Sequence, residues 1–122
     1  HGETQKILDD DQICVNATAV RVPVFFGHAE AVHMETREDI EIEAVRALLD
    51  GAEGVELAEA TEEAGYATPV THAAGKNPVF VSRLRRDITH PRGIDRWVVS
   101  DNVRKGAALN AVQILQSLRN RR

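Results

Sequence analysis

The order of helix-like and strand-like segments predicts an α+β fold, with a mixed β-sheet covered by helices on one face. Strand-like runs and stretches with apolar residues at helical spacing follow one another along the chain. The chain has 122 residues, 43% of them apolar, which suits one domain with a modest core. No internal repeat or domain boundary is recognisable, so residues 1–122 are expected to form one unit.

The first third of the chain predicts one short helix and two strands. Residues 3–8 suit the last turns of a helix, which the three aspartates at 9–11 end. Residues 13–23 are rich in β-branched side chains and predict a strand. Pro23 cannot donate to a ladder, so the pairing should change there or lie at an edge. Gly27 marks a bend, and residues 29–36 alternate well enough for a second strand.

The middle of the chain predicts a helix, a short strand and a loop. Apolar residues recur at helical spacing over 40–49, and Gly51 and Gly54 close that helix. A short strand at 55–57 follows. Residues 61–78 contain two glycines and two prolines and little periodicity, which predicts an extended loop.

The last third predicts two strands and a long C-terminal helix. The strands cover 79–84 and 96–100, and the helix runs from about Val103 to Leu118. Asp101 or Asn102 can cap its start. Its apolar residues line one face.

Composition and charge exclude several classes of protein. The net charge is -4 with an isoelectric point near 5.7, which argues against a dedicated nucleic-acid binder. No apolar run approaches the roughly 18 residues of a membrane span, and no signal-peptide pattern is present. The single cysteine, Cys14, excludes an internal disulfide and indicates a reducing compartment, by default the cytoplasm. Its apolar neighbours predict a buried, inert thiol.

Arg21 and His28 are the first pair of residue types that suit a site. Arg21 lies near the end of one expected strand, and His28 follows the turn at 23–27. A guanidinium can hold a carboxylate with two parallel hydrogen bonds, and an imidazole can transfer a proton near neutral pH. Spacing alone favours the simpler interpretation of a solvated arginine and a structural histidine.

Asn102 lies where a predicted strand ends and a helix begins, a place where ligands often bind. Its residue type alone favours a plain helix cap. The remaining histidines have no metal-ligand spacing, so a metal site is not expected. The arginines at 83, 85 and 86 either bind a phosphate or, as their strand position favours, form ion pairs.

Several segments together resemble the C-terminal region of aspartate-semialdehyde dehydrogenases. The longest match is the run 97–114, and 3–4, 6–8, 20–24, 27–30, 75–76 and 79–87 also fit. The resemblance implies part of the C-terminal domain of the glyceraldehyde-phosphate-dehydrogenase-like type. It covers nearly the whole chain but only about the last third of the family's enzyme.

The resemblance also implies an activity and three site residues. These enzymes reductively dephosphorylate aspartyl phosphate to aspartate semialdehyde with NADPH, on the pathway to lysine, methionine and threonine. By resemblance, Arg21 holds the substrate carboxylate, His28 is the general acid/base, and Asn102 lies near the nicotinamide of NADP. A homodimer or higher self-association is expected.

The departures from the family's pattern are as informative as the matches. The family's nucleophilic cysteine in a Pro-Asn-Cys context and its nucleotide-binding glycines are absent, and Cys14 should not inherit the nucleophile's role. The chain also opens without Met, so a piece of a larger enzyme, inactive by itself, is expected. The alternative is a stand-alone non-catalytic module that dimerises or binds a partner. An N-acetylglutamyl phosphate reductase is disfavoured by residues 98–102 and 105–108.

Overall fold

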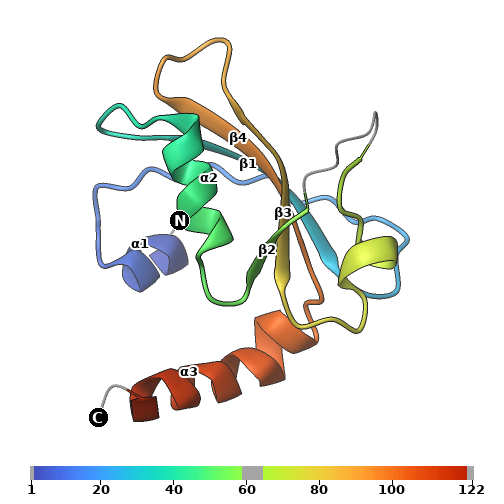
Figure 1. Ribbon diagram of the computed structural model, residues 1–122. Helices are drawn as coiled ribbons and strands as arrows, with labels where there is room; N and C mark the ends of the chain where they lie inside the picture. The colour runs from blue at the N-terminus through green and yellow to red at the C-terminus, as the bar shows by residue number, and fades with distance from the viewer. Residues whose placement is uncertain (1, 59–64, 121–122) are drawn as a thin grey trace.

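A four-stranded mixed sheet forms the centre of the structure, a computed structural model that describes residues 2–58 and 65–120 (Figure 1). The strands are β1 (His28–Glu35), β2 (Val55–Leu57), β3 (Val79–Arg86) and β4 (Gly93–Ser100). Their spatial order is β1-β4-β3-β2. The β1–β4 and β4–β3 pairs are antiparallel and β2–β3 is parallel, which confirms the predicted mixed sheet.

The helices also follow the predicted order. They are α1 (Gly2–Leu8), α2 (Ile42–Asp50) and α3 (Leu109–Asn120), with two short helical turns, η1 (Pro69–Ala73) and η2 (Arg104–Ala108). The C-terminal helix expected from Val103 to Leu118 is not continuous, because Ala107 leaves the helical region at φ -139° and ψ -108°. No described helix has the length and apolar character that a bilayer crossing requires.

The core is split between the two faces of the sheet. Val99 and Phe80 pack with Ala67 and Ala73 from the segment that carries η1. Ile94 packs in a second cluster with side chains from α2. Ile94 and Val99 lie five residues apart on one regular strand, so their side chains point to opposite faces. The prediction that helices lie on one face is therefore wrong: α2 covers one face and the η1 segment the other.

A bulge in β3 allows this strand to serve both clusters. Ser82 pairs with Trp97 but Arg85 pairs with Asp95, so β3 has one extra residue in this interval. Arg83 adopts a positive φ of 55° within it. Phe80 and Leu84 would share a face in a regular strand, but the extra residue turns Leu84 toward α2.

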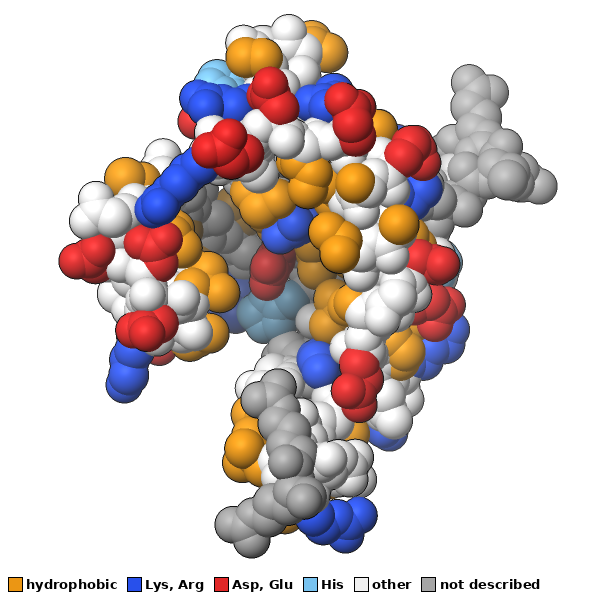
Figure 2. Space-filling view, turned by 60° about the vertical axis from the view of Figure 1, so that its left-hand side comes forward, with side chains coloured by type: hydrophobic (Ala, Val, Ile, Leu, Met, Phe, Trp, Pro, Cys, Tyr) orange, Lys and Arg blue, Asp and Glu red, His pale blue; other side chains and the backbone are white. Residues whose placement is uncertain are grey.

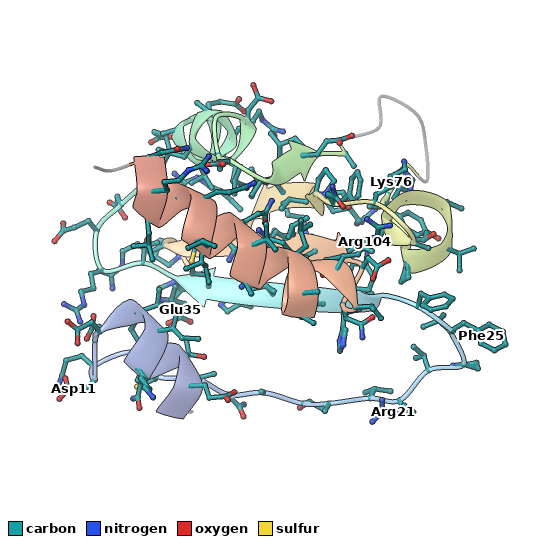
Figure 3. All side chains as sticks on the ribbon, turned by 90° about the horizontal axis from the view of Figure 1, so that it is seen from below. Asp11, Arg21, Phe25, Glu35, Lys76 and Arg104 are labelled. Carbon is teal, nitrogen blue, oxygen red and sulfur yellow. The ribbon has the colours of Figure 1, made fainter. Side chains whose placement is uncertain are left out.

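The predicted strand at residues 13–23 is wrong. These residues run as an extended arm outside the sheet, without a ladder partner among the described residues (Figure 3). β-Branched composition favours extended backbone, but a strand also needs a neighbour with free amide and carbonyl groups. Cys14, expected to be buried, is exposed because no sheet covers the arm.

The arm and α1 contact the rest of the chain through few polar groups. Gln5 Nε2 donates to the carbonyls of Asp11 and Ile13, at 3.1 and 2.9 Å. Arg37 pairs with Asp10 at 3.1 Å and ties this region to the loop after β1. The surface is hollowed in this view, and both hydrophobic and charged side chains border the hollow (Figure 2).

The expected loop at 61–78 is partly helical. Residues 61–64 lie outside the described part of the chain, and Pro69–Ala73 form η1. Thr68 caps this turn, because its Oγ1 accepts from the Thr71 amide at 3.0 Å, and Pro69 occupies the first helical position. A polar residue followed by proline is a helix-start signal that could have predicted the turn.

Candidate functional site

Two of the three predicted site residues lie together where β1 begins and β4 ends. His28 is the first residue of β1 and pairs with Ser100, the last residue of β4. The amide of Gly27 donates to Asn102 Oδ1 at 2.9 Å. This bond joins residues 75 positions apart in the sequence. The structure therefore brings Asn102 to the backbone directly before His28.

Gly27 lies where three segments cross closely. Its φ is +98°, which favours glycine. A Cβ atom at this position would lie 2.8 Å from Cβ of Pro69, at the start of η1, and 3.2 Å from the Ser100 carbonyl oxygen. A glycine is thus required on both conformational and steric grounds.

Asp101, next to Asn102, stabilises the place where Gly27, Pro69 and the end of β4 meet, which we call the corner. It is only 4% exposed. Its Oδ2 accepts from the Gly75 amide at 2.8 Å, and its Oδ1 accepts from the amides of Val103 and Arg104 at 3.0 and 3.2 Å. These amides, Gly75 first, lower the pKa of the Asp101 carboxyl below its ordinary value. Neither predicted alternative is the N-cap residue, which is Val103, but the Asp101 carboxylate accepts from the first amides of this turn. Its link to Gly75 was not predicted.

The wall of the corner formed by η1 is held by side-chain contacts. His72 Nδ1 lies 2.7 Å from Thr71 Oγ1, and the His72 ring meets Phe80 edge-on at 6.0 Å. Trp97 Nε1 donates to the Ala67 carbonyl at 2.8 Å. His72 is therefore part of the packing around η1. The described residues contain no group of three or more His, Cys, Asp or Glu that could hold a metal ion.

The side chains of His28 and Arg21 are both exposed, and neither bonds to another described residue. His28 and Met34 lie six residues apart on β1, so their side chains point to the same face of the sheet, the one that α2 covers. Arg21 lies on the arm, beyond the edge strand β1 (Figure 3). The described contacts thus fix the backbone of His28 but hold Arg21 in no relation to it.

A charged cluster of His33, Asp95 and Arg85 lies on the face of the sheet opposite to that of His28. His33 Nδ1 lies 3.0 Å from Asp95 Oδ1, and Arg85 lies 3.3 Å from Asp95 Oδ2. The hydrogen bond to Asp95, followed by that to Glu35, raises the pKa of His33 above its ordinary value. Arg86 pairs with Ile94 and therefore lies on the other face, with α2, where it bonds to Glu41 and to the Ile40 carbonyl. For Arg85 and Arg86 the ion-pair alternative is therefore correct.

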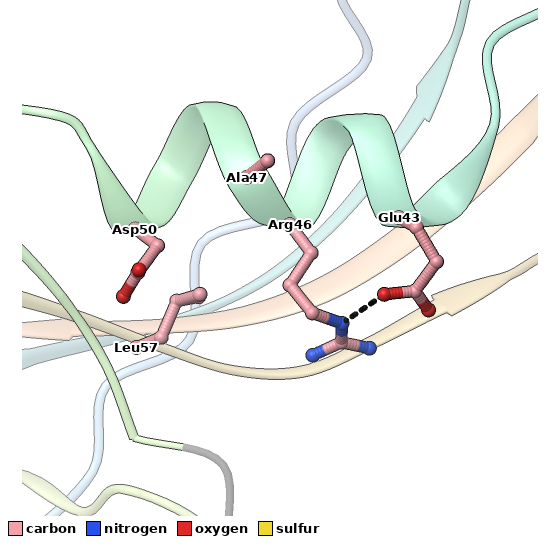
Figure 4. A pocket seen from close by; sticks show the side chains of 5 residues that line it. All are labelled: Glu43, Arg46, Ala47, Asp50 and Leu57. Atoms are coloured by element: carbon pink, nitrogen blue, oxygen red, sulfur yellow. Dashed lines mark hydrogen bonds and ion pairs between the residues drawn. The ribbon is translucent and has the colours of Figure 1, made fainter.

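An open hollow of about 390 Å³ lies between α2 and β2 (Figure 4). Glu43, Arg46, Ala47, Asp50 and Leu57 line it. Arg46 pairs with Glu43 at 3.1 Å, one turn away on the same helix. None of the three predicted site residues lines this hollow.

Comparison with known proteins identifies the family. A family model described as the dimerisation domain of semialdehyde dehydrogenase matches residues 1–105. The aspartate-semialdehyde dehydrogenase of Shewanella sp. (strain DB6705) is 61% identical over 95% of this chain and 34% of its own length. That of Legionella pneumophila is 52% identical over 95% of this chain and 33% of its length.

Solved structures agree with these matches. Aspartate semialdehyde dehydrogenase II of Vibrio cholerae, complexed with ASA, superposes with a TM-score of 0.89 at 54% identity, over 98% of this chain and 34% of that one. The Francisella tularensis enzyme has a TM-score of 0.83 at 24% identity and supports the fold alone. The chain spans about a third of the length of the relatives that it matches. Since the family model covers most of its residues, the chain belongs to the semialdehyde dehydrogenase family, in the region of its dimerisation domain.

Proposed function

We propose that this chain is the C-terminal part of an NADP-dependent aspartate-semialdehyde dehydrogenase. In this proposal the intact enzyme converts aspartyl phosphate to aspartate semialdehyde, and the missing parts supply the nucleotide-binding domain and the nucleophilic cysteine. The support is the identity of up to 61% to enzymes of that name among the relatives compared. By itself the chain is expected to be inactive.

The observation that carries the proposal is the anchored start of β1. An acid/base group must sit at a fixed place and still reach its substrate. The His28 backbone is held by the pairing with Ser100 and by the Gly27–Asn102 bond, while its imidazole is exposed. We assign His28 the transfer of a proton to and from the reacting thiol and substrate.

We assign to Arg21 the binding of the substrate carboxylate. A guanidinium fork matches a carboxylate with two hydrogen bonds. Arg21 spends none of its donors on another described residue, so all remain for a ligand.

The described residues do not fit the pyrophosphate of a dinucleotide. Such a group needs free backbone amides in a glycine-rich turn. Of the three positive-φ glycines, Gly27, Gly54 and Gly75, two already donate their amides to Asn102 and Asp101, and all three lie too far apart in the sequence to share such a turn. NADPH supplies the hydride, and we place its phosphates on the nucleotide-binding domain outside this chain.

Kinetics of the intact protein test the assignment. Reduction of NADP is followed with aspartate semialdehyde and phosphate, in the reverse direction. His28→Ala is expected to lower turnover by about 10²- to 10⁴-fold with little change in the Michaelis constant. Arg21→Lys is expected to raise the Michaelis constant for the semialdehyde, because an ammonium cannot reproduce the fork. Arg37→Lys is the matched control, since the Arg37 side chain pairs at the surface with Asp10 and with no other described residue.

Each part of the assignment fails on a different result. Absence of NADP-dependent turnover in the intact protein refutes the proposed dehydrogenase activity. Unchanged kinetics in His28→Ala or Arg21→Lys removes that residue from the site. A Michaelis constant that rises at unchanged turnover makes His28 a binding residue instead.

We further propose that the intact enzyme is a homodimer in the cytoplasm. The family model is described as a dimerisation domain, and the single cysteine suits a reducing compartment. Light scattering on the intact protein measures the assembly, and a monomer at micromolar concentration would contradict it.

A further inference from the structure

We infer that Asn102 is a positioning residue, whose carbonyl oxygen holds the Gly27 amide and thereby places His28. The inference rests on the proposed role of His28. It differs from the role that the family resemblance implies for Asn102, which is contact with the nicotinamide of NADP.

The first step concerns the place of His28 in the sheet. It is the terminal residue of β1, and within the described part of the chain β1 is an edge strand that pairs with β4 alone. The ends of edge strands open easily, because few bonds hold them. The residues before Gly27 form the arm and make no ladder bonds to described residues. The Gly27–Asn102 bond is therefore the last anchor before the unpaired arm, and it adjoins His28 directly.

The second step concerns the rigidity of the anchor itself. Asn102 follows Asp101, whose two carboxylate oxygens accept from three backbone amides. The Asp101 carbonyl also accepts from the amides of Arg104 and Lys105, at 3.2 and 2.8 Å. Immediately before this turn, Val99 is fully buried in the core. The backbone that carries Asn102 is thus fixed from both sides, and so is its carboxamide.

The third step concerns the space around Gly27. Pro69 and the Ser100 carbonyl leave no room for a Cβ atom there, so the peptide can shift little toward either. The bond to Asn102 sets the remaining freedom, the orientation of the Gly27 amide. The direction in which β1 leaves the turn, and hence the place of His28, follows from that orientation.

The Asn102 carboxamide has an acceptor oxygen and a donor nitrogen, and only the oxygen bonds to a described residue. Oδ1 accepts from Gly27, while Nδ2 makes no bond to any described residue. The two roles therefore separate chemically. Positioning needs the oxygen acceptor, whereas a contact to a carbonyl of the nicotinamide needs the N–H donor.

The test uses the intact enzyme with two substitutions at one position. Asn102→Ala removes both ends, and Asn102→Asp keeps the acceptor and removes the donor. We expect Asn102→Ala to lower kcat by up to about 100-fold, the typical effect of a misplaced catalytic group. We expect Asn102→Asp to recover most of that loss, and the Michaelis constant for NADP to change little in either variant. Asn77→Ala is the matched control, because Asn77 Oδ1 accepts from Arg104 at the surface at 2.9 Å.

A double variant separates positioning from general loss of structure. A residue that acts only through His28 has no further effect once the imidazole is gone. His28→Ala with Asn102→Ala should therefore turn over as slowly as His28→Ala alone. A multiplied loss means that Asn102 acts independently of His28 and overturns the inference.

Other outcomes are equally decisive. Equal losses in Asn102→Ala and Asn102→Asp, with a raised Michaelis constant for NADP, assign Asn102 to the cofactor and overturn positioning. Unchanged turnover in Asn102→Ala overturns it as well. If His28→Ala alone has no effect, the acid/base assignment of the proposed function fails, whatever Asn102 does.

Discussion

Replacement of Gly27 by alanine tests whether the crossing at the start of β1 is as tight as its geometry indicates. A left-handed backbone costs a non-glycine residue about 1–2 kcal/mol, and φ is +98° here. The added Cβ would also lie 2.8 Å from Cβ of Pro69, and overpacking of this kind typically costs about 1–3 kcal/mol. Gly27→Ala is therefore expected to lower the free energy of unfolding by about 2–5 kcal/mol.

Gly75→Ala is the matched control for the backbone term. Gly75 also has a positive φ, +76°, but a Cβ there would meet nothing within 4 Å. Urea denaturation of the intact protein measures both variants. The excess cost at Gly27, about 1–3 kcal/mol, is the part due to crowding. Pro69→Gly removes the clashing atom and should reduce that excess in a double variant. Equal costs at Gly27 and Gly75 would refute the close crossing.

Three further predictions concern stability, and urea denaturation of the intact protein checks each. The bond to Asp95 raises the pKa of His33 above its ordinary 6.5, so its contribution is complete below that pH and declines as pH rises through the folded pKa. His33→Gln should flatten the stability profile there, and an unchanged profile contradicts the linkage. The pKa of Asp101 is lowered from 3.8, chiefly by the Gly75 amide, so its contribution holds above that pH and declines as pH falls through the folded pKa. Asp101→Asn should lose that acid dependence, and a profile that keeps it argues against the bond. Phe80→Ala should cost about 3–5 kcal/mol, because the side chain is fully buried, and a cost under about 1 kcal/mol would mean that Phe80 is not a core residue.

The parts of the fold that were correctly predicted depend on local pattern. Strand β2 has the predicted bounds, because a short apolar run follows a glycine that ends the preceding turn. Helix α2 and strand β1 lie within two residues of their predicted starts. Periodicity reports which residues share a face of one element, and it does so without knowledge of neighbours.

The parts that were missed depend on neighbours. The run 13–23 has the composition of a strand but no partner among the described residues. The bulge at Arg83, which turns Leu84 toward α2, arises from the register against β4. The interruption at Ala107 lies directly after Gly106, a residue that weakens a helix interior, but the surrounding alanines and the apolar periodicity still predict an unbroken helix.

The site shows the same division. The family resemblance implied roles for Asn102 and His28 that residue type alone did not favour, whereas their connection through Gly27 spans 75 positions and has no local signal. The second such hydrogen bond, from the Gly75 amide to Asp101, spans 26 positions and could not be predicted from local sequence either. Two adjacent side chains at the end of β4 thus hold two distant loops by their backbone amides.

The two proposed site residues consequently depend on different parts of the protein. The place of His28 is set by Gly27, Asn102 and the end of β4, all within this chain. Arg21 lies on an arm where Val20 is 78% and Phe25 100% exposed. Exposed apolar side chains on an unpaired segment favour any surface that covers them. If Arg21 holds the substrate as proposed, the contacts that place it come from outside the described residues, and we expect substrate binding in the intact enzyme to depend on the covering of this arm.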